Sequence, residues 1–509
     1  MCALDRSHKS FSLSILGHRL RSMPMFLALI PFVVGIIIAN CYVLPLTIVV
    51  VLFVLSLLAA VVAMPRGVTW GYVAMTLVLA GYMLTELRSP VATVPYDESL
   101  EMVVDVEGIP LQREGYSIAD GRIAQWRDGD MWHDADCCVM LWLRAADVVQ
   151  GDRLTVVGEV REHISRYADY NALMRRRGFV GGVGIDEYNI LSVYHVEPTD
   201  VQTRAIGKLD RLAEEGDAHA TVVAMVAGSR HNMSATLREA YSKTGLAHLM
   251  AVSGLHLGIV LIVVSTLLIP LCLIHGGHRV ASLVTIVVVW LYAIMSGSSP
   301  SVVRAAIMLT VLLLSNVVSV SYNRVNALAV TIFAMLVYRP DYLYDVSFQL
   351  SVMAVFGIVA WGVPAMSAMR SWSWLGAKLL SLLVVGVVAT LWTLPIVSYT
   401  FDNLPIIGVI LTPCVLLFGY AVLVGGMFAL VLPAAIAVPF ITVAEWAAGV
   451  QNSIVMSASK LPFAAVDYTM PAWGVALCYA LYAAFTLLYW SKNQKKVVTL
   501  PRYDWLERP

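Results

Sequence analysis

The stretch GLAHLMAVSGLHLG, residues 245–258, places reactive side chains at the start of a long apolar segment. Ser253 and His256 are three residues apart and share one face of a helix, so the serine could act as a nucleophile with the histidine as its base. Such catalysis also needs an orienting group and an oxyanion site, and the segment contains no acidic residue. Alternatively, these groups hydrogen-bond between helices, and Gly254 with the glycine four residues later allows another helix to approach closely. The residues alone leave both interpretations open.

A second polar group lies in SGSSPSVVRAAIM, residues 296–308. Ser299 followed by Pro300 is typical of a helix start, because serine caps the first amides and proline fits the first helical position. Arg304 then lies in the opening turns of an otherwise apolar helix, where free N–H groups and a guanidinium can hold a phosphate. The sequence therefore predicts an anion site. The alternative is an arginine that extends to the membrane interface or pairs with a buried carboxylate.

A third group lies in RPDYLYDVSFQLSVMAVFG, residues 339–357, where Asp345 and Gln349 share a helical face and Ser351 adds a hydroxyl. We expect Asp345 to be the ion-pair partner of Arg304. In the alternative interpretation, Asp345 only favours the start of a helix after the preceding proline.

The elements that position these residues are predicted to be membrane helices. Of the 509 residues, 59% are hydrophobic and 13% are charged, which excludes an ordinary soluble protein. Apolar windows of about 20 residues recur, the length that crosses a bilayer as a helix. We therefore predict a polytopic α-helical membrane protein with about twelve transmembrane helices and a small inserted extracytoplasmic all-β domain.

Lysine and arginine gather in alternate loops, which gives the orientation, because short loops rich in these residues stay in the cytoplasm. Both termini are then cytoplasmic, and the β domain lies outside the inner membrane. The expected organisation is a cytoplasmic N-terminus (1–23), three transmembrane helices (24–89), the β domain (90–200), an amphipathic helical connector (201–243), the main transmembrane domain (244–490) and a cytoplasmic basic tail (491–509).

Residues 90–200 alternate between apolar and polar side chains in five short runs, a pattern that predicts a small β-barrel or sandwich. Between Asp97 and Asp200 there are 20 acidic residues against 10 arginines and no lysine. Binding of a single-stranded nucleic acid usually relies on a basic groove with aromatic side chains. The candidate contacts are Arg175, Arg176 and Arg177 with Tyr170. Otherwise the domain gates a path or binds a partner.

Some functions lack any motif in the sequence. The sole Gly-Lys pair, Gly207 and Lys208, is followed by leucine, so there is no P-loop of the G-x-x-x-x-G-K-[ST] type. The eleven histidines form no dense cluster with carboxylates, so we predict no metal site and no cofactor. We also expect no catalytic residue and no enzyme activity.

Taken in order, HLMAVSGLHLG, PSVVRAAIM, SFQLSVMAVFG and TLPI followed by LPIIG resemble the motifs of the ComEC family of competence proteins. The resemblance implies a channel that passes single-stranded DNA across the bacterial inner membrane during natural transformation. It also implies that the β domain is OB-like. The polar membrane residues of the family correspond to His248, Ser253, Gly254, His256, Pro300, Arg304, Gln349 and Ser351, and the resemblance assigns none of them a role. We expect the DNA path to be lined or shaped by His248, Ser253, Gly254, His256, Arg304, Asp345, Gln349 and Ser351.

The resemblance also implies partners: single-stranded DNA, membrane lipid, a periplasmic DNA receptor, a cytoplasmic DNA-binding or motor protein, and a second copy of the chain in a homo-oligomer. Many members carry a C-terminal metallo-β-lactamase-like domain, which we expect this chain to lack. Two alternative functions remain open: a transporter of a smaller anionic or lipid-linked substrate, and an intramembrane hydrolase that uses Ser253 and His256.

Overall fold

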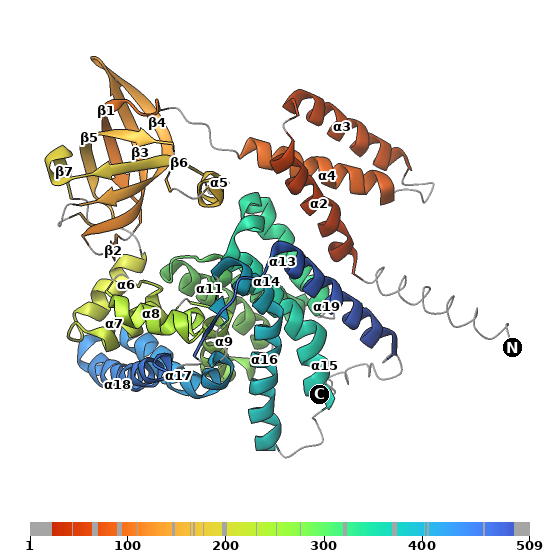
Figure 1. The fold of residues 1–509 in the computed structure, drawn as a ribbon. Coiled ribbons are helices and arrows are strands. Elements are labelled where there is room, and N and C mark those ends of the chain that lie inside the picture. The colour runs from red at the N-terminus through yellow and green to blue at the C-terminus, as the bar shows by residue number, and fades with distance from the viewer. Residues whose placement is uncertain are drawn as a thin grey trace. The chain divides into compact units, whose positions relative to one another are not determined.

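The elements of the chain are shown in Figure 1, as a computed structural model. It describes residues 23–492 except 43, 64–69, 89–93, 109, 114, 145–147, 163, 166–167, 177, 196–200, 231, 251, 275, 319–322, 369–373, 402, 405–406 and 462–463. The chain divides into two compact units. The smaller unit consists of Met1–Leu27, Leu350–Leu404 and Val466–Pro509, and the larger unit of Ala28–Gln349 and Pro405–Ala465.

Three apolar helices come first in the described chain: α2 (Pro24–Cys41), α3 (Leu46–Ala63) and α4 (Trp70–Leu87). Glycines let α2 and α4 touch backbone to backbone, because a Cβ at Gly35 would overlap the carbonyl oxygen of Val78, and a Cβ at Gly81 that of Phe32. Contacts of this kind replace the hydrophobic driving force that is missing between helices in lipid.

The turn between α2 and α3 is held by Tyr82 of α4. The Tyr82 hydroxyl accepts a hydrogen bond from the N–H of Leu44 at 2.6 Å and donates one to the carbonyl oxygen of Tyr42 at 3.0 Å. Backbone groups near a bilayer must find partners within the protein, and this tyrosine provides them.

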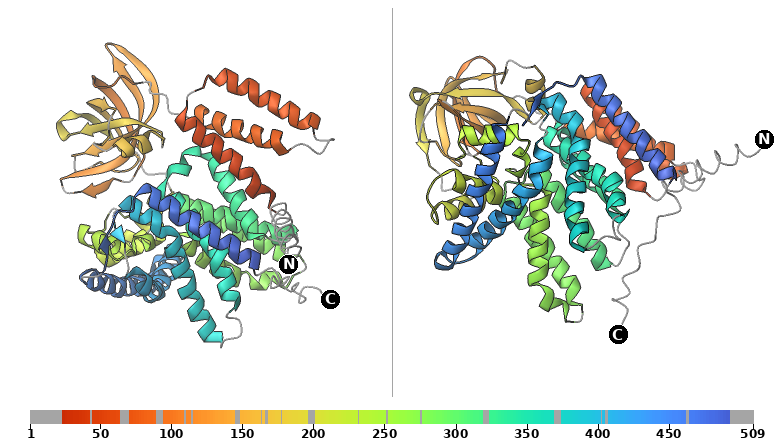
Figure 2. Two further views of the ribbon diagram at one scale, coloured as in Figure 1. Left: turned by 45° about the vertical axis from the view of Figure 1, so that its right-hand side comes forward. Right: turned by 60° about the horizontal axis from the view of Figure 1, so that its bottom comes forward.

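The sheet domain is a closed barrel of mixed strand direction, visible in orange and yellow in Figure 2. Its strands are β1 (Ser99–Val106), β2 (Leu111–Arg113), β3 (Tyr116–Asp128), β4 (Met131–Leu143), β5 (Arg153–Arg161), β6 (Phe179–Ile185) and β7 (Ile190–Tyr194). Their order is β1-β3-β4-β6-β5-β7, and a further β1–β5 pairing closes the barrel. β4 and β6 run parallel, and the other pairs are antiparallel. The alternating buried positions of these strands form the core.

The domain differs from the expected five-stranded all-β unit in three ways. A short additional strand, β2, precedes β3. The last predicted run contains two strands, β6 and β7, separated by the 3₁₀ turn Glu187–Asn189. A helix, α5 (Ala168–Arg176), also lies between β5 and β6. Polar alternation alone did not distinguish one long strand from two short ones around a turn.

The chain between the barrel and the main membrane domain forms three helices: α6 (Val201–Asp210), α7 (Asp217–Ala227) and α8 (Ala235–Lys243). Every residue of α7 from His219 to Ala227 is buried, because most of them are apolar and the two polar ones, His219 and Thr221, form hydrogen bonds inside the protein. It packs against α17 (Gly408–Val431) and α18 (Ala434–Ser459).

The remaining helices of the larger unit carry the motif residues. They are η3 (Ala247–Leu249), α9 (Gly254–Leu267), α10 (Ile269–Cys272), α11 (Gly277–Met295), α12 (Pro300–Val318), α13 (Arg324–Tyr338), η4 (Pro340–Tyr344) and the start of α14 (Val346–Gly357). α9, α11 and α12 pack against one another and against the α7 core.

The smaller unit continues α14 through the π-helix η5 (Ile358–Gly362), α15 (Val363–Ala368), α16 (Trp374–Phe401), β8 (Asn403–Leu404), β9 (Val466–Asp467) and α19 (Ala472–Lys492). Its centre is aromatic: Trp392 of α16 packs edge-on against Trp361 at 5.2 Å between ring centroids. Gly357 makes room for Trp392, because a Cβ there would overlap the indole.

Among the described residues, nine helices are long and apolar enough to cross a membrane. Three of the spans expected from sequence correspond to shorter apolar segments: Gly254–Leu267, Pro300–Ser315 and Arg324–Tyr338. The number twelve therefore stays a prediction. The chain is a polytopic helical membrane protein with an inserted sheet domain.

Candidate functional site

The polar start of α9 is built around one nitrogen of His256. Nδ1 of His256 accepts a hydrogen bond from the backbone N–H of Ser253 at 3.1 Å, and Ser253 Oγ lies 2.9 Å from the same atom. Ser253 is the N-cap residue and His256 the third residue of the helix, the positions of a capping box. The local reason for both residue types is thus the helix start itself.

The second ring nitrogen of His256, Nε2, takes no part in this helix cap. His256 is 1% exposed, and its Nε2 has no hydrogen-bond partner among the described residues. A catalytic histidine needs an orienting group on the nitrogen that faces away from the nucleophile. In the part of the chain that the structure describes, this group is missing, so the geometry favours a helix cap over a serine hydrolase.

His248 lies in a different environment from His256. Its side chain is exposed, and Nδ1 donates to the carbonyl oxygen of Gly245 at 2.9 Å. The neighbouring Leu249 and Met250 are only 3% and 2% exposed. The segment therefore turns one polar ring toward solvent-accessible space while its apolar residues pack inward.

Gly254 brings the first two motifs together. A Cβ at Gly254 would lie 3.4 Å from Cβ of Ala305, whereas a Cβ at Gly258 would meet nothing within 4 Å. Only the first of the two glycines therefore mediates a close contact between α9 and α12. That contact lies directly beside Arg304 in the sequence of α12.

Arg304 is buried and has no counter-ion among the described residues. It is 3% exposed, and its Nη2 lies 3.5 Å from Ser301 Oγ, so the guanidinium folds back toward the start of α12. Its Nε and Nη1 atoms, and Oγ of Ser299 in the same region, have no partner in the described chain. Arg304 and Asp345 both lie in the described part of the chain and form no ion pair there, so this prediction was wrong.

Asp345 instead starts a helix, the alternative interpretation of its position. It is 5% exposed, and its Oδ1 accepts the N–H of Phe348 at 3.0 Å in the first turn of α14. Gln349 strengthens the same junction, since Nε2 donates to the carbonyl oxygen of Leu343 at 2.8 Å. Ser351 is partly buried and belongs to the smaller unit. Spacing could not distinguish a capping aspartate from a paired one.

In the basic run of the sheet domain, the structure describes the side chain of Arg175, which is paired with a carboxylate. Arg175 donates to Glu162 at 2.6 Å, and Tyr170 is 37% exposed. The side chain of Arg176 and the whole of Arg177 lie outside the described residues. The prediction that this segment contacts DNA therefore stays a prediction.

Other arginines of the barrel are also engaged with its own carboxylates. Hydrogen bonds to Glu107 and Asp136 raise the pKa of Arg122 above its usual range. Ion pairs also involve Arg127, Arg144, Arg153 and Arg161. Since 20 acidic residues stand against 10 arginines, the domain keeps a net negative charge even with these pairs formed.

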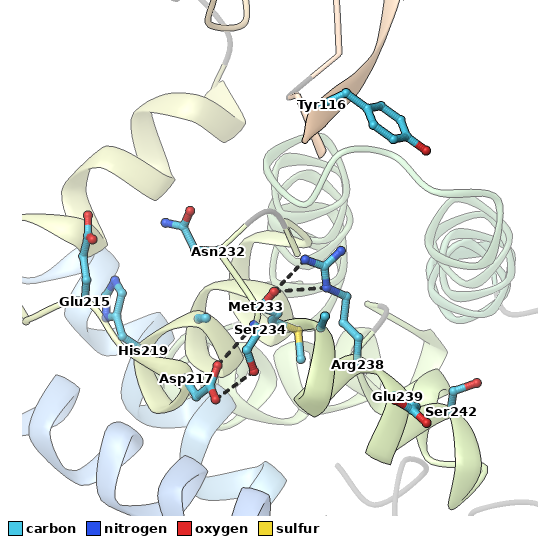
Figure 3. Close-up of a pocket in the computed structure, with 13 residues that line it drawn as sticks. Tyr116, Glu215, Asp217, His219, Asn232, Met233, Ser234, Arg238, Glu239 and Ser242 are labelled. Atoms are coloured by element: carbon cyan, nitrogen blue, oxygen red, sulfur yellow. Dashed lines mark hydrogen bonds between the residues drawn. The ribbon is translucent and has the colours of Figure 1, made fainter. Parts of the chain in front are cut away.

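Sequence reasoning missed a cluster of ionisable side chains around a buried histidine in the larger unit. His219 on α7 lies 2.9 Å from Asp210 Oδ1 through Nε2, and 2.9 Å from Glu445 Oε1 through Nδ1. It also lines a pocket of about 1250 Å³ formed by α7, α8, the loops before them and Tyr116 of β3 (Figure 3). The available signal was Glu445, the sole charged residue in the apolar helix α18, since such residues are rarely placed without a function.

Comparison with known proteins places these residues in a family. The family model described as "Competence protein" matches residues 225–493, more than half of the chain. This range includes the three membrane motifs and Glu445 but not the sheet domain. ComE operon protein 3 of Bacillus subtilis (strain 168) is 30% identical over 193 residues, which cover 38% of this chain and 24% of that protein.

An uncharacterized protein of Aquifex aeolicus (strain VF5) is 31% identical over 198 residues, 38% of this chain and 43% of that protein. The matched region thus spans less than half of either relative. No solved structure matches the chain significantly. On the extent of the family match and the ordered motifs inside it, the chain belongs to the ComEC family of competence proteins.

Proposed function

We propose that this chain forms a path by which single-stranded DNA crosses the bacterial inner membrane during uptake for natural transformation. The observation that carries the proposal is Arg304, which is 3% exposed and has two guanidinium nitrogens without a partner in the described chain. Leaving a buried charge uncompensated is strongly unfavourable. A phosphodiester of a passing strand would supply the missing acceptors.

The proposed path is lined or shaped by the motif residues His248, Ser253, Gly254, His256, Arg304, Asp345, Gln349 and Ser351. The contact between Gly254 and Ala305 supports a shared location for the first two motifs. The ring of His248, at the surface of the chain, supports a polar lining near them. Conduction needs sites that bind loosely enough to release, so a few weak phosphate contacts suit a channel better than one strong site.

The sheet domain is proposed to be an OB-like domain on the extracytoplasmic side, with both termini of the chain in the cytoplasm. Support comes from the closed order β1-β3-β4-β6-β5, a five-stranded barrel with β2 and β7 added outside it. Arg175, Arg176, Arg177 and Tyr170 are its proposed DNA contacts. Its acidic composition makes it a weak binder at most, and a periplasmic DNA receptor and a cytoplasmic motor protein are the proposed partners.

Uptake of labelled DNA by a deletion strain tests the function. The strain would be complemented with the wild-type chain, with Arg304→Glu, or with Arg324→Glu as a matched control. Arg324 also lies at the start of an apolar helix, but its side chain is exposed. We expect Arg304→Glu to reduce internalised DNA by at least tenfold, with little effect of the control, because charge reversal repels a polyanion.

If deletion leaves internalisation unchanged while DNA binds the cell surface normally, the channel proposal is wrong. Equal effects of Arg304→Glu and Arg324→Glu at equal protein levels would remove Arg304 from the path. If Arg304→Glu blocks DNA entry but leaves the passage of small anions normal in proteoliposomes, the chain forms a DNA path and not a transporter of smaller substrates.

A further inference from the structure

His219 joins three helices through two carboxylates. It lies on α7 and is 3% exposed, between Asp210 at the end of α6 and Glu445 in the middle of α18. The two carboxylate side chains are 36% and 26% exposed, so both have some access to solvent. Figure 3 shows the imidazole at the edge of the pocket, beside Glu215 and Asp217.

The geometry defines the charge state that gives the most favourable contacts. A carboxylate oxygen can only accept, so both contacts at 2.9 Å are hydrogen bonds when both ring nitrogens carry hydrogen. That form is the imidazolium ion. Removal of one proton would turn a nitrogen lone pair toward a carboxylate and replace a charge-assisted hydrogen bond by repulsion.

The charged groups around His219 do not offer it another strong partner. α17 contains no charged residue, and Glu445 is alone in α18. On α7, Asp217 accepts from the N–H and Oγ of Ser234. The other charged or titratable residues of the neighbouring elements are Arg204 and Lys208 on α6, Arg211, Glu214 and Glu215 in the following loop, and Arg238, Glu239, Tyr241 and Lys243 on α8. Of these, Arg238 donates to the carbonyl oxygen of Met233, and Tyr241 to Asn452.

A second polar contact holds the same end of α6, and it does not depend on His219. Nζ of Lys208 donates to the carbonyl oxygens of Leu430 at 2.6 Å and Leu432 at 3.0 Å. These carbonyls lie at the C-terminus of α17, where backbone acceptors lack helical partners. The C-terminal end of α6 is therefore attached to the α17–α18 pair by one lysine contact and one histidine contact.

We propose that Asp210, His219 and Glu445 form a proton-dependent latch that fixes the C-terminal end of α6 to α7 and α18. The latch is closed when the imidazole is protonated and weakens as rising pH removes the proton. The latch makes the contact between the connector helix and the competence domain responsive to pH. The inference is independent of what passes through the membrane domain.

Hydrogen exchange of α6 in the full-length protein tests this latch. The protein would be held in nanodiscs between about pH 5 and pH 9, with exchange times scaled for the intrinsic pH dependence of the amides. In the wild type we expect the protection of residues 206–210 to fall on the order of tenfold as pH rises, the equivalent of one charged hydrogen bond. His219→Gln should show lower protection at the acid end and no such slope.

Two further variants separate the latch from a general loss of packing. Lys208→Met removes the contact that does not involve the imidazole, so protection should fall at every pH with the slope intact. Glu445→Gln keeps the histidine but removes one of its two carboxylate acceptors, so protection at the acid end should fall toward that of His219→Gln. A pH-independent wild type, or a slope that persists in His219→Gln, would overturn the proposal. If His219→Gln does not fold, a Glu445→Gln profile identical to wild type would do the same.

Discussion

Ser253 donates its backbone N–H to Nδ1 of His256 at 3.1 Å, and its hydroxyl lies 2.9 Å from the same nitrogen. One lone pair on Nδ1 therefore faces two donors, and the imidazole closes the first turn of α9. A nucleophilic serine would need that nitrogen for itself. The arrangement makes His256 a capping residue whose other nitrogen remains available at the buried edge of the site.

Replacement of His256 by glutamine separates the cap from the imidazole. Glutamine at the third helical position also accepts from the N-cap amide, so His256→Gln should change the free energy of unfolding by less than about 0.5 kcal/mol. His256→Leu loses the acceptor and should cost about 1 kcal/mol. Thermal unfolding of the purified protein measures both. Normal DNA uptake with glutamine and impaired uptake with leucine would assign the histidine to the cap, and loss of uptake with both would assign it to the path.

Replacement of Arg304 by methionine should have opposite effects on stability and on function. The guanidinium is buried without a counter-ion in the described chain, so an apolar side chain of similar length should stabilise the DNA-free protein by about 1–4 kcal/mol. DNA uptake should fall in the same variant. Arg339→Met is the control, because Arg339 pairs with Asp341 at 2.8 Å and its loss should destabilise. A less stable Arg304→Met protein would show that the resting structure already satisfies this charge.

Hydropathy and helix-start chemistry predicted much of the architecture. Uncharged windows located the nine long helices and the shorter ones that carry the motifs, because exclusion from water depends on composition. Ser299 before Pro300 correctly located the start of α12. The Ser253 and His256 neighbours followed from helical periodicity. These inferences need only residues that are close in sequence.

Contacts between distant segments could not be predicted in the same way. From the sequence, Asp345 was the acidic residue expected to pair with Arg304. In the structure it caps α14 instead, because the first amides of a helix also need an acceptor and compete with the guanidinium for the carboxylate. Glu445 and His219 are 226 residues apart, and no periodicity connects them. Their meeting depends on how α7 packs on α18, which a single sequence does not encode in any local pattern.

The contact between Gly254 and Ala305 can be tested by a paired substitution. Gly254→Val should cost about 1–3 kcal/mol in the free energy of unfolding. A Cβ alone at this position would lie 3.4 Å from the Cβ of Ala305, so the two further methyl groups of valine would come too close to it. Ala305→Gly should restore part of that loss in the double variant. Gly258→Val is the control, since nothing lies within 4 Å of a Cβ there. Equal costs at the two glycines would mean that α9 and α12 do not meet at Gly254.

The ion pair between Arg175 and Glu162 gives a test of the sheet domain as a DNA-binding surface. The two side chains lie 2.6 Å apart and are about half exposed, so the pair itself adds little stability. If the Arg175–Arg177 segment contacts the strand, Glu162→Gln should release Arg175 and tighten binding of a labelled single-stranded oligonucleotide by the full-length protein. Arg175→Gln should weaken it and lower the slope of log affinity against log salt by about one.

The contrast between these two variants is what makes the measurement decisive. A general change in the net charge of the acidic domain would also tighten binding in Glu162→Gln, so Glu187→Gln, on the turn between β6 and β7, serves as the charge-matched control. Selective tightening in Glu162→Gln places Arg175 on the strand. Equal affinities in both glutamine variants, with no effect of Arg175→Gln, would leave the acidic barrel without a direct DNA contact and favour a role in gating or partner binding, because its own carboxylates would then repel the polyanion.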